Sequence, residues 1–237
     1  MKKILTLVVF PIAIIALAFM IYKSISKPVK FNNEKAAREA VAIQQLKDIR
    51  TLQVTYKSAK SCYAPTMDTL IDFYNNGKIT VVLQIGSTDD SVAVMHTESI
   101  KKSRRKITEQ ELYKMYLAGD KKLIVSLPVD VNVKDTLFND RPDFDVEKLR
   151  YIPFADGDTV IMSSIVKTVS GVNVPLFEAK IPYGQRPAPG EDFRGLLFGM
   201  DKQLIINLNA ERNDTGRYPG LMVGSIDQAN NNAGNWE

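Results

Sequence analysis

The chain of 237 residues has one cysteine, Cys62, and one histidine, His96. A single cysteine cannot form a disulfide within the chain or supply a cysteine cluster for zinc. A single histidine cannot build a histidine-rich metal site. The sequence also lacks a phosphate-binding P-loop, a G-x-G-x-x-G turn and a G-x-S-x-G nucleophile elbow. These absences argue against the common classes of enzyme, and we expect no catalytic residues, no cofactor and no metal.

Two aspartate pairs have the spacing D-x-D, Asp143 with Asp145 and Asp156 with Asp158. Paired carboxylates can bind a divalent metal or take part in acid–base catalysis. Both pairs lie next to proline or glycine in expected turns, where aspartate is favoured because it hydrogen-bonds to its own backbone. Turn formation is the favoured interpretation, and a metal-dependent enzyme that uses Asp156 and Asp158 is the alternative.

Strong net charge is absent as well, since the formal charge is +4 and the pI is about 9.0. A slight excess of lysine on a solvated surface explains this balance, so we expect no nucleic-acid partner. Hydrophobic residues make up 45% of the chain and charged residues 24%. These values are typical of a globular protein with a real core.

The first long feature is the uncharged apolar run Ile4–Tyr22, which follows Lys2 and Lys3. Its length of about 19 residues is close to the ~20 that a helix needs to cross the hydrocarbon layer of a bilayer. We expect residues 1–23 to be a transmembrane anchor. A cleaved secretory signal is the alternative, because Ala16-Leu17-Ala18 resembles a small-x-small cleavage site. The expected membrane-facing residues are Ile4, Leu5, Val8, Phe10, Ile14, Leu17, Phe19 and Ile21.

Lysines flank the apolar run on both sides, so the positive-inside rule does not decide its orientation. A signal-like start before a long domain favours export of that domain. We therefore expect a single-pass protein of a bacterial inner membrane, in contact with its lipid, with the C-terminal domain in the periplasm. Residues 24–32 are expected to be a juxtamembrane linker, because Pro28 biases Lys27 away from helix. The lysines of this linker suit lipid headgroups.

A long amphipathic helix is predicted from about Asn33 to Lys60. Its apolar residues recur at steps of three and four and form one stripe. Most polar residues, including Gln44 and Asp48, are expected to lie away from it. The stripe either packs on the protein's own sheet or meets a partner helix. Its members are Ala36, Ala40, Ile43, Leu46, Ile49, Leu52 and Tyr56.

Pro65 is expected to end this helix, and Thr66 to cap a short second helix that stops at Asn76-Gly77. The order of Leu52-Gln53, Tyr56, Tyr63-Ala64-Pro65-Thr66 and Leu70 resembles pilin-like proteins, in particular the pseudopilins of type II secretion. The resemblance covers about the first third of the chain and implies a place in an envelope assembly. Prepilins also carry a glycine at their cleavage point and a glutamate shortly after it. This chain has no glycine before Gly77 and no glutamate before Glu34, so the resemblance does not extend to prepilin processing.

The run Ile79–Gly86 is predicted to be a strand, because it is β-branched and bounded by turn residues. Ser87–Lys106 is expected to be a polar loop that contains His96. Thr108 and Glu111 form a capping box for a helix that ends before Gly119. The basic cluster at the end of the loop is either a solvated surface or an electrostatic contact for anionic lipid or an acidic partner. It consists of Lys101, Lys102, Arg104, Arg105 and Lys106.

The rest of the chain is expected to be rich in strands, with one helix at Gln203–Ala210 and a surface loop at Pro182–Gly195. Trp236 in the polar tail either docks into the domain or lies at a partner surface. The predicted strands are Leu123–Val133, Lys148–Phe154, Thr159–Val169, Val172–Ile181 and Leu221–Ile226, and Gly171 is predicted to turn the fourth back on the third.

Three later segments, Leu149–Phe154, Val174–Lys180 and Asn230–Glu237, resemble a family of uncharacterised, membrane-anchored envelope proteins of Bacteroidota. That resemblance implies an envelope location and no assigned chemistry. We expect an α+β protein with one transmembrane helix, a long amphipathic helix and a mostly antiparallel sheet with short helices. Its domains are expected to be 1–23, 24–32 and 33–237, the last divided into a pilin-like helical part, 33–77, and a β-rich part, 78–237.

The expected function is a non-enzymatic subunit or accessory of a multi-protein envelope assembly, a secretion or motor complex. Its partners would be membrane or envelope proteins, and the sequence leaves the oligomeric state open. The alternative is a stand-alone tethered module that binds a ligand or the cell wall through the loops around Lys101–Lys106 and Pro182–Gly195.

Overall fold

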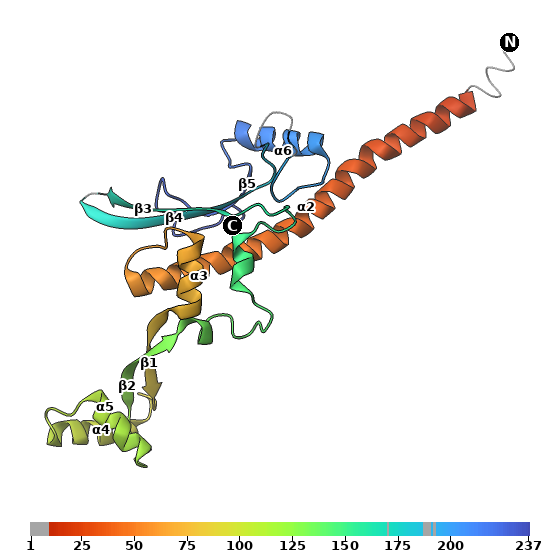
Figure 1. The fold of residues 1–237 in the computed structure, drawn as a ribbon. Helices are drawn as coiled ribbons and strands as arrows, with labels where there is room; N and C mark the ends of the chain where they lie inside the picture. The colour runs from red at the N-terminus through yellow and green to blue at the C-terminus, as the bar shows by residue number, and fades with distance from the viewer. Residues whose placement is uncertain (1–9, 170, 187–190, 192) are drawn as a thin grey trace, which may run out of the picture. The chain divides into compact units, whose positions relative to one another are not determined.

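The computed structural model describes residues 10–169, 171–186, 191 and 193–237. A long N-terminal helix is followed by two small antiparallel sheets and short helices, which confirms the predicted α+β class (Figure 1). The expected anchor residues Ile4, Leu5 and Val8 lie outside the described residues. The helices are α2 (Phe10–Lys60), α3 (Met67–Asn76), α4 (Ser91–Ser103), α5 (Glu109–Leu117) and α6 (Lys202–Asp214). The strands are β1 (Lys78–Ile85), β2 (Val125–Asn132), β3 (Ile161–Val169), β4 (Val172–Pro182) and β5 (Gly220–Gly224).

The described residues form two compact units. We call residues 10–71 with Asp145–Glu237 the helix–sheet unit, and Asp72–Phe144 the hairpin unit. The expected division into 33–77 and 78–237 does not coincide with these units, because the chain leaves the helix–sheet unit within α3 and returns to it at Asp145.

The helix α2 is continuous over 51 residues, with Pro28 inside it. The expected break at Pro28 is therefore wrong, and residues 24–32, expected to be a juxtamembrane linker, are part of this helix. Proline removes one intrahelical hydrogen bond, the one that the carbonyl of Ser24 would accept. Ser24 is exposed, so solvent can satisfy this carbonyl, and long helical stretches on both sides keep the segment helical.

The core of the helix–sheet unit lies between α2 and a three-stranded sheet of order β3-β4-β5. Leu46, Ile49 and Leu52 of α2 are fully buried, as are Phe177 and Ile181 of β4. Figure 1 shows α2 on one face of this sheet and α6 on the other. The outer positions of the predicted stripe differ from its centre, since Ala36 and Ala40 are exposed and Ile43 and Tyr56 are half-buried.

Polar side chains occupy part of the buried face of α2. Gln53 is fully buried, donates from Nε2 to the carbonyl of Ala64 at 3.0 Å and accepts from the Ala64 amide at 2.9 Å. Gln45 donates to the carbonyl oxygens of Leu149 at 2.9 Å and Tyr151 at 2.8 Å. The expectation that Asp48 lies away from the stripe is wrong, because its side chain is buried as well. The side-chain amides of Gln45 and Gln53 thus hold two irregular segments, around Leu149–Tyr151 and at Ala64, against α2.

The hairpin unit is built on the antiparallel pair β1–β2, in register from Lys78↔Asn132 to Ile85↔Val125. Between the two strands the chain forms α4 and α5, which pack around Leu112, Leu123 and Val125. The predicted capping box of α5 is present at Thr108. The expectation of a loop at Ser87–Lys106 is wrong for most of its length, because α4 begins after the cap residue Asp90.

Several later predictions are confirmed, and one is wrong. β3 and β4 form the predicted hairpin, in register from Ile161↔Lys180 to Val169↔Val172, and α6 includes the helix expected at Gln203–Ala210. The strand expected at Lys148–Phe154 is absent, and a short 3-10 helix covers Val146–Arg150. Nε2 of Gln45 instead lies within hydrogen-bond distance of three carbonyl oxygens of this region, those of Lys148, Leu149 and Tyr151, and holds the segment against α2.

Candidate functional site

The first part of α2 carries the longest series of exposed large apolar side chains among the described residues. Its large apolar side chains, from Phe10 to Val29, are between 51% and 69% exposed. By length and composition α2 is the one described helix that could cross a membrane, and its position near the N-terminus fits a single-pass membrane protein. The exposed large apolar residues are Phe10, Ile12, Ile14, Ile15, Leu17, Phe19, Met20, Ile21, Tyr22, Ile25 and Val29.

The folded part of the helix–sheet unit meets α2 shortly after this surface. Lys27 Nζ lies 3.3 Å from Asp201 Oδ2, and Phe31 is 8% exposed. Asp201 also caps α6 by accepting from the amides of Gln203 and Leu204. The amide hydrogen bond from Leu204 and the hydrogen bond from Lys27 hold the pKa of Asp201 below its ordinary value. This ion pair between α2 and the start of α6 thus lies five residues beyond the apolar run.

A polar network then ties α2 to the end of β4. Tyr183 is fully buried and donates to the carboxylate of Glu39. Arg38 donates to the carbonyl oxygens of Leu196 at 3.1 Å and Phe198 at 2.8 Å. Burial, together with the Glu39 carboxylate, raises the pKa of Tyr183. These hydrogen bonds join α2 to segments of the same unit, so the network fixes the helix in place.

Tyr218 is half-buried, and its buried hydroxyl has no hydrogen-bond partner among the described residues. Burial, with a smaller effect from Glu178, raises the pKa of Tyr218 from 10.0 to about 12. Below pH 10 the phenol is neutral in the folded and the unfolded chain. Between pH 10 and pH 12 only the unfolded chain ionises, so the free energy of unfolding falls as pH rises.

We therefore expect Tyr218→Phe to leave stability at pH 7 nearly unchanged, because no hydrogen bond is lost, and to reduce the loss of stability between pH 10 and pH 12. Urea unfolding of the full chain in detergent at both ends of this range measures the difference. Tyr151→Phe is the control, since Tyr151 is 50% exposed. An equal alkaline loss in the wild type and Tyr218→Phe would contradict the prediction.

The basic cluster lies in the hairpin unit and divides into two groups. Lys101 pairs with Glu109 at 2.7 Å, and Lys102 lies 3.6 Å from Glu98. Both lysines belong to the last turn of α4, where positive charge also favours the helix dipole. The other three residues follow α4 and line a hollow of about 650 Å³ together with Ile107, Glu111, Lys114 and Met115.

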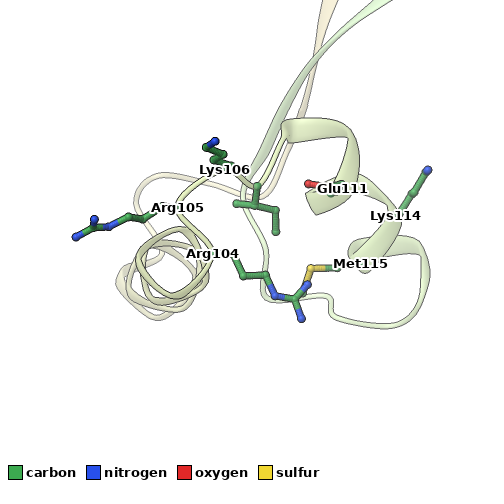
Figure 2. A pocket seen from close by; sticks show the side chains of 7 residues that line it. Arg104, Arg105, Lys106, Glu111, Lys114 and Met115 are labelled. Carbon is green, nitrogen blue, oxygen red and sulfur yellow. The ribbon is translucent and has the colours of Figure 1, made fainter.

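Figure 2 shows the side chain of Arg104 extending toward Met115, whereas Arg105 and Lys106 extend in other directions. The carboxylate of Glu111 accepts from the Thr108 amide at 2.9 Å as part of the capping box. The hollow therefore has a cationic rim and an apolar floor, but its cations do not converge on one point. Such a surface suits a flexible or extended anionic partner better than a small ion.

The remaining candidate residues have local structural roles. His96 lies on α4, not in a loop, and its Nε2 is 2.8 Å from Asp120 Oδ2. The His96 hydrogen bond lowers the pKa of Asp120. Asp145 caps the 3-10 helix by accepting from the Glu147 amide, and Asp158 lies 3.9 Å from Arg194. Within the described part of the chain, no three histidine, cysteine, aspartate or glutamate residues are grouped as a metal would need.

The C-terminal tail docks on the helix–sheet unit. Arg50 of α2 pairs with Glu237 at 2.7 Å, and Asn232 donates to the Tyr63 hydroxyl at 2.9 Å. Asn235 exchanges hydrogen bonds with the backbone of Met222 in β5. Trp236 is half-buried between these contacts. Sequence reasoning left the place of the tail open, because its contacts are with residues far away in the chain.

Comparison with known proteins gives no relative on which a function could rest. No protein family, no curated protein and no solved structure matches the chain. The resemblances to pilin-like proteins and to envelope proteins of Bacteroidota stay expectations from sequence.

Proposed function

We propose that this chain is a non-enzymatic, membrane-anchored subunit or accessory of a multi-protein assembly in the bacterial envelope. Its anchor would cross the inner membrane, and both folded units would lie in the periplasm. One observation carries the proposal: α2 is a single helix whose first part exposes apolar side chains and whose second part supports the core of the helix–sheet unit.

This arrangement couples the fold directly to the membrane. A flexible tether needs only an apolar segment and a linker, whereas here the anchor continues into the core without interruption. A module that only needs to stay near the membrane gains nothing from such rigidity, while a subunit that must hold a defined position in an assembly does. The pilin-like order of residues around Tyr63-Ala64-Pro65 supports the same interpretation, and Gln53 holds that turn against α2.

The test is gentle detergent extraction of the tagged full-length chain, followed by mass spectrometry of the intact chain and of the proteins that co-purify. We expect an intact mass near 26.5 kDa and a stoichiometric set of membrane or envelope proteins. A tagged single-pass protein of unrelated sequence, expressed at the same level, is the control for non-specific capture. A chain that purifies alone and is cut after Ala18 would contradict both the retained anchor and the assembly.

The alternative function, a stand-alone tethered binding module, is favoured by the cationic hollow at Arg104, Arg105 and Lys106. The second expected binding loop, Pro182–Gly195, falls partly outside the described residues. Retention of the purified chain on isolated cell wall would support this function if Arg104→Gln, Arg105→Gln and Lys106→Gln together abolish it. Lys101→Gln with Lys102→Gln is the control, because those lysines are paired with glutamates and do not line the hollow.

A further inference from the structure

Apolar exposure on α2 continues past the end of the apolar run. Ile25 is 62% exposed and Val29 is 51% exposed, and they follow Ile21, which is 60% exposed, at intervals of four residues. Residues four apart lie on the same side of a helix. Ile21, Ile25 and Val29 therefore form one line, which extends the membrane-facing surface of the anchor along the side of the helix that leads out of the bilayer.

The opposite side of the same segment carries lysines and the contacts with the folded unit. Residues two apart in a helix are separated by about 160° around its axis. Lys23 and Lys27 lie two residues on either side of Ile25, and Lys27 and Phe31 lie two residues on either side of Val29. Lys27 pairs with Asp201 and Phe31 is buried, so the helix–sheet unit lies on the side away from Ile25 and Val29.

If α2 crossed the bilayer upright, this line of apolar residues would lie outside the hydrocarbon layer. Val29 lies seven residues beyond Tyr22, about 10 Å farther along the helix axis. In an upright helix both Ile25 and Val29 would stand among headgroups or in water. Membrane helices are tilted by about 20° on average, and flanking residues and packing set the direction of the tilt. A tilt toward the line brings both side chains nearer to the apolar phase and moves the folded unit away from the bilayer.

We propose that residues 23–31 of α2 lie obliquely in the headgroup region of an anionic bilayer, with Ile25 and Val29 toward the acyl chains and Lys23, Lys27 and Lys30 among the phosphates. Two features favour lipid as the occupant of this face. The face is continuous with the surface that would contact lipid in the membrane, and three cations flank it within eight residues. The proposal rests on the proposed anchoring of α2 and adds its direction of tilt and its lipid partner.

The test uses the full-length chain with Cys62→Ser, labelled with a nitroxide at one introduced cysteine. The variants are Lys23→Cys, Ile25→Cys, Val29→Cys and Lys30→Cys, with Ile14→Cys as the reference within the membrane. Each is reconstituted in vesicles of phosphatidylcholine and phosphatidylglycerol, and the accessibility of the label to oxygen and to a water-soluble nickel complex is measured. We expect the oxygen-to-nickel ratio at positions 25 and 29 to exceed that at 23 and 30 several-fold.

The expected ratios depend on the face of the helix and not on position along the chain, because position 23 is nearer to the span than 25 and 29 but is expected to have the lower ratio. A ratio that falls steadily from 23 to 30 would show an upright helix and overturn the proposal. Low accessibility to both reagents at 25 and 29 would show that a protein covers this face, which also overturns it. In vesicles of phosphatidylcholine alone the ratio at 25 and 29 should fall, and an unchanged ratio would exclude a role for anionic headgroups. Nickel access at position 14 would instead refute the anchor itself, and with it the proposed function.

Discussion

Replacing Leu46 with aspartate is expected to unfold the helix–sheet unit. Leu46 of α2 is fully buried, so the change removes apolar volume and buries a carboxylate in the core. Truncation of a buried leucine alone costs about 2–5 kcal/mol, and an unpaired buried charge adds to this. The sum is comparable with the total stability of an ordinary domain, about 5–15 kcal/mol.

Fluorescence of Trp236, the only tryptophan, measures this effect in the full chain in detergent, because the tail that carries it docks on α2 and β5. We expect Leu46→Asp to lose the folded signal at temperatures where the wild type keeps it. Val41→Asp is the matched control on the same helix, where the side chain is 48% exposed and a cost below about 1 kcal/mol is expected. Equal effects of the two substitutions would show that α2 does not support the core.

The second large effect is expected at the membrane. Replacing Ile14 and Leu17 with arginine should release the chain from membranes, because each change from an apolar residue to arginine near the centre of a span costs about 3–4 kcal/mol of insertion free energy. Two such changes amount to about 6–8 kcal/mol, a factor of more than ten thousand in partition. The two side chains are 65% and 58% exposed, so the folded unit should not be affected.

Alkaline carbonate extraction of membranes, followed by sedimentation, measures the partition. The wild type should sediment with the membrane, and the double variant should stay in the supernatant or fail to be exported. Leu117→Arg is the matched control, because Leu117 is 62% exposed on α5 in the hairpin unit, outside the expected span. If the double variant sediments like the wild type after carbonate, then another part of the chain holds it at the membrane.

The elements that sequence predicted well carry local signals. The capping box at Thr108 defines the start of α5, and the β-branched run that begins at Ile79 defines β1. The sequence does not reveal α4, because its inward face consists of Ala93, Thr97 and the partly buried Ile100, which give only a weak apolar period. The helix α4 shows that a helix can be specified by an aspartate cap and tertiary contacts with only a weak amphipathic pattern.

On α2, by contrast, the apolar period predicts more buried residues than the structure has. Ala36 and Ala40 are exposed, while the amides of Gln45 and Gln53 are buried. Burial of an amide depends on whether backbone groups from elsewhere come within reach, and periodicity does not contain that information. The basic cluster is similar, because the charge run is visible in the sequence, whereas the pairing of Lys101 with Glu109 depends on how α4 and α5 pack.

The continuity of α2 also has a consequence for biosynthesis. Leu46 enters the chain about 130 residues before β4, and α2 contacts both β4 and β5, so the contacts that bury α2 are long-range. Chains are made from the N-terminus, and an anchor inserted early would hold this uncovered apolar face beside a bilayer until β4 and β5 emerge. During synthesis the lipid surface would therefore compete with the native sheet for the apolar face of α2.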